Sequence, residues 1–216
     1  MKDFHTIAFD PQKCSQELDE FRKLLDSKDI LSEQDDLQPF FERSLHLTSY
    51  VGTTFGLNIG IARQVAYQFE LLGDYSADVV IGNRERQFCW VELENGDPKA
   101  VLAKVADRAT KEWGRRLEHG FSQLVDWFYL LDDFKNTDRL QRNFGYGHID
   151  FVGLLLIGHT RGLDDHDIRR LRWCTRKVII DSHPIICMTF DQLYHDLKDR
   201  LDLYSAAFKL ETQGGS

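Results

Sequence analysis

Three strand-like runs follow one another within residues 65–94, which read VAYQFELLGDYSADVVIGNRERQFCWVELE. Residues 65–71 alternate apolar and polar side chains, as a half-buried strand does. Residues 77–81 and 88–94 are two further runs that contain β-branched or aromatic side chains, and turn-forming residues follow each of them. Strands separated by turns this short predict an antiparallel meander.

The other segments alternate between helical and strand patterns on either side of this meander. Apolar residues at helical spacing predict helices over residues 14–27, from Ser32 to about 46–50, 99–113, 116–132, 164–175 and 189 to about 203. Strands are expected at 149–157, 178–180 and 185–188. This order predicts an α/β fold in which helices flank a mixed central sheet and further helices precede it.

The chain divides into an N-terminal helical part, residues 1–62, a core, residues 63–208, and a tail, residues 209–216. Residues 51–62 are Gly-rich and carry no clear pattern. The run at 149–157 is almost continuously apolar, which is typical of a strand buried on both faces. A chain of 216 residues is long enough to bury a sizeable core.

Composition narrows the class of protein. The formal net charge of −8 argues against a protein that coats DNA indiscriminately, but it leaves room for a nuclease because local charge matters more than the sum. The N-terminus lacks the apolar segment of a signal peptide, and no apolar run is long enough to span a bilayer, so we expect a cytoplasmic protein without a membrane partner. The four cysteines are scattered without metal-site spacing, which favours neither a disulfide framework nor a zinc ribbon.

Three carboxylates stand out in the meander: Asp78 in its second strand, and Glu92 and Glu94 in its third. Glu92 and Glu94 point to the same face because side chains two apart on a strand share a face, and hairpin pairing can bring Asp78 beside Glu92. Converging carboxylates suit Mg²⁺ (or Mn²⁺), which polarises a phosphoryl oxygen and lowers the pKa of bound water. The alternative is the solvated side of a half-buried sheet. The apolar flanks Trp90 and Leu93 favour an interior strand, where a carboxylate needs a partner or a metal.

These residues also carry a resemblance to a known family. Residues 73–81 (GDYSADVVI), 90–94 (WVELE) and 123–127 (QLVDW) resemble the nuclease domain of the Shedu anti-phage family, over roughly Ser32 to Leu201. That domain belongs to the PD-(D/E)XK superfamily and is similar to NucS-type DNA-mismatch nucleases. The resemblance implies a restriction-endonuclease-like core, a metal-dependent DNA endonuclease activity in bacterial anti-phage defence, DNA as partner, and self-assembly into a homo-oligomer.

Position by position, the resemblance makes Asp78 the first metal ligand and Glu92 the second. The superfamily's Lys, which positions the attacking water or stabilises charge, falls at Glu94, so this chain departs from the usual pattern. Some restriction enzymes of the superfamily carry Glu there, where it acts as a general base or an extra ligand. The alternative is a degenerate, inactive site.

Two further residues enter through the same resemblance. Related enzymes take an additional ligand from a Glu on the first core helix, which Glu33 fits best and Glu42 second, although Glu33 could equally cap its helix beside Ser32. Gln123 and Trp127, placed at the edge of the apolar face of helix 116–132, resemble the QxxxY arrangement of the superfamily. Gln123 would then orient the metal shell or a phosphate, and the alternative is a tolerated polar residue on an amphipathic helix.

Basic residues recur along the helix expected at 99–113. Lys104, Arg108, Lys111 and Arg115 are spaced by four, three and four residues, opposite an apolar stripe of Leu102, Val105, Ala109 and Trp113. Such a face predicts a track for the DNA phosphate backbone, with ordinary solvated surface as the alternative. Arg169, Arg172 and Arg176 form a second basic row on the helix expected at 164–175, and His148 with Asp150 gives only a weak indication of a metal site.

These observations leave three hypotheses. The first is a Mg²⁺-dependent DNA endonuclease. The second is a non-catalytic DNA-binding module with the same fold, and the third is an interaction or assembly domain, which the acidic charge permits.

Overall fold

The computed structural model describes residues 4–55, 62–72, 75–106, 108, 110–135, 137–180 and 182–213, without the side chains of Leu72 and residues 207–213. The helical elements are α1 (Pro11–Ser27), a π-helical turn η1 (Glu33–Leu37), α2 (Gln38–Arg43), α3 (Leu45–Phe55), α4 (Arg115–Asp133), α5 (Asp138–Phe144), a 3₁₀ turn η2 (Thr160–Gly162), α6 (Asp165–Lys177) and α7 (Phe190–Gln213). The strands are β1 (His5–Thr6), β2 (Gln64–Leu72), β3 (Tyr75–Gly82), β4 (Gln87–Leu93), β5 (Leu102–Ala103), β6 (Glu112–Trp113), β7 (Asp150–Leu156), β8 (Ile179–Ile180) and β9 (His183–Met188). The expected α/β class is confirmed.

A mixed seven-stranded sheet forms the centre, in the order β1-β2-β3-β4-β7-β9-β8. The strands β2, β3 and β4 pair antiparallel, which confirms the predicted meander. β7 pairs parallel with both β4 and β9, so the apolar run expected to be buried on both faces lies in the middle of the sheet. The predicted β8 and β9 close the far edge.

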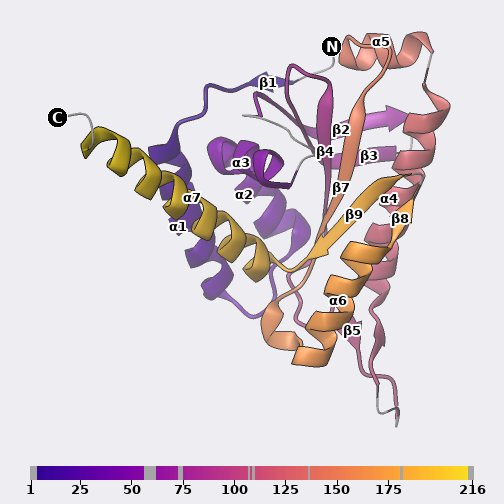
Figure 1. Ribbon diagram of the computed structural model, residues 1–216. Coiled ribbons are helices and arrows are strands. Elements are labelled where there is room, and N and C mark those ends of the chain that lie inside the picture. The colour runs from indigo at the N-terminus through magenta and orange to yellow at the C-terminus, as the bar shows by residue number, and fades with distance from the viewer. Residues whose placement is uncertain are drawn as a thin grey trace.

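Helices cover both faces of this sheet, as Figure 1 shows. α1, α2, α3 and α7 pack on one face in a cluster that includes Val79 and Val91, whereas α4, α5 and α6 pack on the other in a cluster that includes Val80 and Trp90. Neighbouring residues of one strand thus enter different cores, as the two-residue period of a strand requires. Among the described residues, no helix is both long and apolar enough to cross a bilayer.

The N-terminal helices are broken more often than the sequence pattern predicts. The single helix expected from Ser32 is three elements, η1, α2 and α3, which together run to Phe55. α3 lies very close to the sheet, because a Cβ on Gly52 would stand only 2.2 Å from Cγ2 of Ile81 in β3. The Gly-rich segment left without a pattern therefore begins inside α3, and its residues 56–61 lie outside the described ones.

The helix predicted over residues 99–113 is wrong. Leu102 pairs with Trp113 across a short antiparallel hairpin, β5–β6, and Gly114 donates a hydrogen bond to the carbonyl of Val101 at 2.9 Å. Ala100, Val101 and Leu102 are buried consecutively, which one face of a surface helix cannot achieve. Residues 102 and 113 shared the predicted apolar stripe and instead face each other as strand partners, because tertiary packing overrides a weak helical preference.

The remaining helices follow the predictions except at α5 and at the end of α7. α4 and α6 match the helices expected over residues 116–132 and 164–175. α5, which lies between α4 and β7, was not predicted, and α7 continues to Gln213 instead of ending near residue 203. Residues 214–216 of the expected tail lie outside the described residues.

Candidate active site

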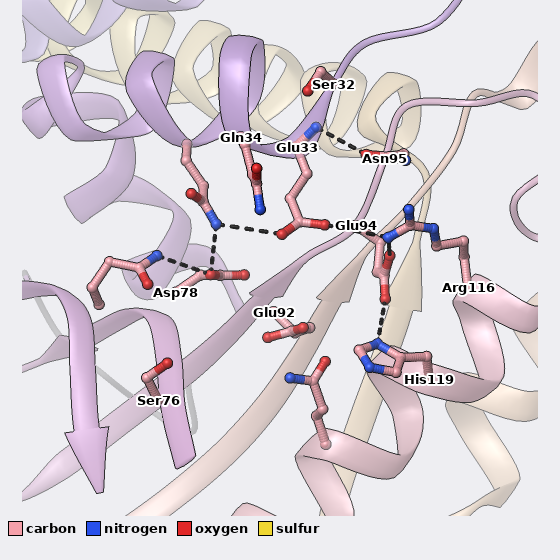
Figure 2. A pocket seen from close by; sticks show the side chains of 13 residues that line it. Ser32, Glu33, Gln34, Ser76, Asp78, Glu92, Glu94, Asn95, Arg116 and His119 are labelled. Carbon is pink, nitrogen blue, oxygen red and sulfur yellow. Dashed lines mark hydrogen bonds and ion pairs between the residues drawn. The ribbon is translucent and has the colours of Figure 1, made fainter. Parts of the chain in front are cut away.

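A polar pocket of about 670 Å³ opens where β3 and β4 meet the first turns of η1 and α4. Figure 2 shows the side chains that line it. They are Ser32, Glu33, Gln34, Gln38, Gln68, Ser76, Asp78, Glu92, Glu94, Asn95, Arg116, His119 and Gln123. The three carboxylates singled out from the meander, together with Glu33 and Gln123, therefore share one cavity.

Strand register brings Asp78 and Glu92 together. Val79 of β3 pairs with Val91 of β4, so the residues one step further, Asp78 and Glu92, stand next to each other on the α4 face. Asp78 and Glu92 also interact directly through their side chains. The pairing that was assumed from the sequence is thus present.

Helix α4 passes directly over the stems of the two glutamates. A Cβ on Gly120 would stand 3.2 Å from Cγ of Glu94 and 3.4 Å from Cγ of Glu92, as well as 2.6 Å from Leu155. Only glycine allows this close approach. The small residue at position 120 therefore lets α4 bring its polar residues to the end of β4.

Asp78 is held by three hydrogen bonds. Its Oδ1 accepts from the side-chain amides of Gln38 at 2.9 Å and Gln68 at 3.0 Å, and its Oδ2 accepts from the backbone N–H of Leu93 at 2.8 Å. Burial raises the pKa of Asp78, whereas these hydrogen bonds to the ionised form lower it. The carboxylate is oriented before any ligand binds.

Gln68 reaches Asp78 from an irregular position in β2. Its φ is 45°, in the left-handed region that non-glycine residues rarely adopt, and its neighbours Tyr67 and Phe69 pair with Val79 and Ala77. Backbone conformations that are rarely populated tend to cluster at functional sites. Here the amide of Gln68 is directed at the buried carboxylate of Asp78.

Glu92 lies in the most electrostatically unfavourable position. It is 6% exposed, and burial together with the negative charges of Asp78, Glu94 and Glu33 raises the pKa of Glu92 to about 10. Without a cation in the pocket, Glu92 therefore holds a proton at neutral pH. Four carboxylates so close together require added positive charge before all of them can ionise.

Two side chains from α4, a guanidinium and an imidazole, contact the fully buried Glu94. The guanidinium of Arg116 lies 3.1 Å from Oε2 of Glu94 and 3.7 Å from Glu33, and Nδ1 of His119 lies 3.0 Å from Oε1 of Glu94 (Figure 2). Neither Arg116 nor His119 was predicted. Their spacing of three residues from each other, and of four from His119 to Gln123, places all three on one face of α4, and this was the available sequence signal.

Glu33 lines the pocket and does not cap its helix. Ser32 caps η1 by accepting from the N–H of Asp35 at 3.2 Å, and Asp36 accepts from the N–H of Ser32 at 2.8 Å. The carboxylate of Glu33 is left facing the cavity, where burial and the neighbouring acids raise its pKa to about 7. Glu42, the second choice for this role, is exposed on α2.

Gln123 and Trp127 have different positions on α4. Gln123 lines the pocket, and its Oε1 is buried without a hydrogen-bond partner among the described residues. Trp127 is fully buried beneath it, 6.1 Å from the ring of Trp90 between centroids, so its predicted position at the edge of the helix face is wrong.

The four residues predicted as a phosphate track do not share a helix face. Lys104 and Arg108 are exposed in the segment that joins β5 to β6, and Arg115 is the exposed first residue of α4. Lys111 lies 2.5 Å from the buried carboxylate of Asp167, so its charge is already neutralised. Ala109 of the predicted apolar stripe lies outside the described residues.

The donor set of the pocket fits a divalent cation. Glu92, Glu94 and His119 each offer a ligand atom within 4.8 Å of the others, and Asp78 adjoins Glu92. Carboxylate oxygens suit Mg²⁺ and Mn²⁺, and an imidazole nitrogen favours Mn²⁺ and other first-row transition metals. The pKa of Glu92 is raised because burial and the neighbouring carboxylates oppose its ionisation, and a bound cation would counter both effects.

Comparison with known proteins agrees with the resemblance carried by these strands. A family model described as Shedu protein SduA, C-terminal, matches residues 31–194, from the strand bridge at Leu31 into α7. The chain belongs to the Shedu family. The match includes every pocket residue as well as β7 and β9, and Shedu membership suggests a role in anti-phage defence. No curated protein matches the chain.

Proposed function

We propose that this Shedu chain is a metal-dependent DNA endonuclease with a PD-(D/E)XK-type site, acting in bacterial anti-phage defence. The observation that carries the proposal is the cluster of Asp78, Glu92 and Glu94, 9%, 6% and 1% exposed, at the floor of a polar pocket. Buried carboxylates without matching positive charge are unfavourable unless a ligand supplies it. Mg²⁺ or Mn²⁺ is that ligand in the proposal.

In the proposed mechanism, Glu92, Glu94 and the imidazole of His119 would hold the ion. Asp78 completes this set from β3, kept in place by Gln38 and Gln68. A divalent cation bound there supplies positive charge to the phosphodiester group as it is hydrolysed. The protein's contribution is to fix the ligands in advance, so that little reorganisation accompanies the reaction.

Three further residues have proposed roles around the scissile phosphate. Arg116 supplies the positive charge that the superfamily's Lys would carry, and it delivers this charge from α4 because position 94 holds Glu. Glu33 accepts the proton of the attacking water, since it faces the cavity and stands outside the cluster of Glu92, Glu94 and His119. Gln123 has an Oε1 without a partner among the described residues, and this oxygen would accept a hydrogen bond from a water in the pocket.

The partners follow from the same proposal. DNA is the substrate, and a homo-oligomer in the bacterial cytoplasm is the assembly that the Shedu resemblance implies. The alternative is a non-catalytic DNA-binding module, which the absence of Lys at position 94 favours. The two differ in one measurement, because the alternative binds DNA without cutting it.

The test is nicking of supercoiled plasmid DNA in Mg²⁺ or Mn²⁺. Asp78→Asn and Glu92→Gln keep the size of each side chain and should reduce the nicking rate by about a hundredfold or more, since each removes charge from the ligand set. Glu118→Gln, an exposed acid on α4, is the matched control and should retain the wild-type rate. Nicking that survives both Asp78→Asn and Glu92→Gln would overturn the proposal.

A further inference from the structure

A second pocket, of about 470 Å³, lies between the β5–β6 hairpin and α6. Its lining is aromatic and basic, and consists of Trp113, His166, Arg169, Arg170 and Trp173. The four residues from α6 lie at intervals of three and four along the helix and therefore share one face. None of the described residues that line this aromatic–basic pocket is acidic, although the chain as a whole carries a net charge of −8.

One wall of the aromatic–basic pocket is rigidly built. The guanidinium of Arg170 stands 4.6 Å from the ring centroid of Trp113 and donates a hydrogen bond to the carbonyl of Lys111 at 2.8 Å. The ammonium of Lys111 is in turn 2.5 Å from Asp167, which is buried on the same helix. These contacts attach the hairpin to α6, so Trp113 and Arg170 are presented in a fixed arrangement (Figure 1 shows α6 beside β5).

The other wall of the aromatic–basic pocket, formed by Arg169 and Trp173, is exposed to solvent. Trp173 is 62% exposed, whereas Trp90 and Trp127 are fully buried and Trp113 is half-buried. Arg169, one turn before Trp173, is also exposed. An indole that faces water beside an exposed guanidinium offers a stacking surface next to a site for an anion.

We propose that this aromatic–basic pocket binds an unpaired nucleotide of a DNA strand, with the base stacked on Trp173 and the phosphate held by Arg169. Base–aromatic stacking requires an exposed π-face, which a base inside a duplex does not offer. The absence of acidic residues among the described lining residues suits the negative charge of the backbone. The substrate class would thus be DNA with a single-stranded segment, a frayed end or an extruded base.

The position of the pocket links it to the carboxylate site, and in this respect the inference rests on the proposed function. Trp113 is three residues before Arg116, which contacts Glu94, so their Cα atoms are at most about 11 Å apart. Gly114 fixes this junction, because a Cβ there would stand 2.0 Å from the carbonyl oxygen of Ala100. The two pockets are therefore joined through the Trp113–Arg116 junction, with the exposed Arg115 between these two residues.

The test measures binding of a fluorescently labelled single-stranded DNA 12-mer by anisotropy in the presence of EDTA. Trp173→Ala should bind about five- to one-hundredfold more weakly than wild type, the range expected for the loss of one base stack, and Trp173→Phe should recover most of the affinity. Arg169→Gln should weaken binding and lower the slope of log K against log salt by about one. Tyr129→Ala, which removes a 69% exposed aromatic from α4 outside the pocket, is the matched control and should bind as wild type does.

Three results would overturn the proposal. The first is wild-type affinity in Trp173→Ala, and the second is an equal loss in Tyr129→Ala. The third is that free deoxyadenosine monophosphate binds as tightly as the 12-mer, which would assign the pocket to a free nucleotide. Because EDTA removes any catalytic ion, the binding result stands whether or not the chain cleaves DNA. Loss of nicking in Asp78→Asn together with normal 12-mer binding would support both the proposed function and the nucleotide-binding pocket. Nicking that persists in Asp78→Asn and Glu92→Gln would contradict only the proposed function.

Discussion

Replacement of Glu92 by Gln should remove most of the pH dependence of stability between pH 6 and 8 in the metal-free protein. The pKa of Glu92 rises from 4.5 to about 10 on folding, because burial and three neighbouring acids oppose its ionisation. The folded state therefore binds more protons than the unfolded state across this window. The contribution of Glu92 is fully present below pH 4.5 and is lost as pH rises toward 10. Gln has the same shape and carries no charge.

The size of the effect follows from the width of the window. Each pH unit between the two pKa values changes the free energy of unfolding by about 1.4 kcal/mol, so wild type should lose at most ~3 kcal/mol between pH 6 and pH 8. For a chain of this length that loss corresponds to roughly 6–12 °C in Tm. Glu33, whose pKa is raised to about 7, adds a loss in the same direction below pH 7.

Thermal unfolding of wild type, Glu92→Gln and the control Glu118→Gln in EDTA at pH 6, 7 and 8 measures this directly. Saturating Mn²⁺ should reduce the slope for wild type, since a bound cation removes the penalty for ionising Glu92, and should stabilise wild type by ~3 kcal/mol at a hundred times Kd. Glu92→Gln should be the more stable protein in EDTA at pH 8 and should gain less from Mn²⁺. A slope in Glu92→Gln as steep as that of wild type would refute the reasoning, because the carboxylate cluster would then not be the source of the strain.

Three further perturbations test particular contacts. His119→Ala should lower Mn²⁺ affinity by about tenfold or more in calorimetry, with a smaller change for Mg²⁺, and should abolish nitrogen coupling to bound Mn²⁺ in electron paramagnetic resonance. Coupling that persists in His119→Ala would exclude this imidazole as a ligand. Gly120→Ala should cost ~1–3 kcal/mol of stability in denaturant unfolding, because its Cβ would meet Leu155 at 2.6 Å. Gly147→Ala should cost little, because its Cβ would meet only Oε1 of Gln141, at an ordinary contact distance of 3.8 Å. Lys111→Ala should cost ~3–5 kcal/mol in the same assay by leaving Asp167 buried without its partner, and Lys104→Ala, at an exposed position, should stay within ~0.5 kcal/mol of wild type.

The sheet could be predicted because its signals are local. Alternation in β2, the apolar run of β7 and the turns between the meander strands each fall within a short window, and together they predict the strands and the antiparallel meander. The register that brings Asp78 to Glu92 is allowed by this meander but is not determined by it. The β5–β6 hairpin could not be predicted in this way. Its basic residues happen to recur at helical spacing. The ion-pair partner of Lys111 is Asp167, which lies 56 residues further along the chain. A contact over that distance leaves no trace in local periodicity.

The same limit separates the site residues that were predicted from those that were missed. Strand geometry pointed to Asp78 and Glu92, whereas Gln38 and Gln68 reach Asp78 from elements 40 and 10 residues away. Gln68 does so only through a positive φ, which no pattern in β2 predicts. His119 and Arg116 were within reach of sequence reasoning, because they share a helix face with Gln123. The apolar stripe of α4 gives a stronger periodic signal, and it marks the opposite, buried side of the helix.

In the proposed PD-(D/E)XK-type site, position 94 holds Glu in place of Lys, and this difference is best judged from the charges around it. Exchanging Lys for Glu lowers the charge by two units in a site that already contains Asp78 and Glu92. Considered from the sequence alone, this change suggests an inactive site. In the structure, Arg116 and His119 both contact Glu94 from the face of α4 that Gly120 brings against β4. A relic would have no need of a buried glutamate held by two such partners, since an apolar residue would fill the space at lower cost. The arrangement is what the proposed function requires, with α4 supplying positive charge through Arg116 and Glu94 offered as a ligand.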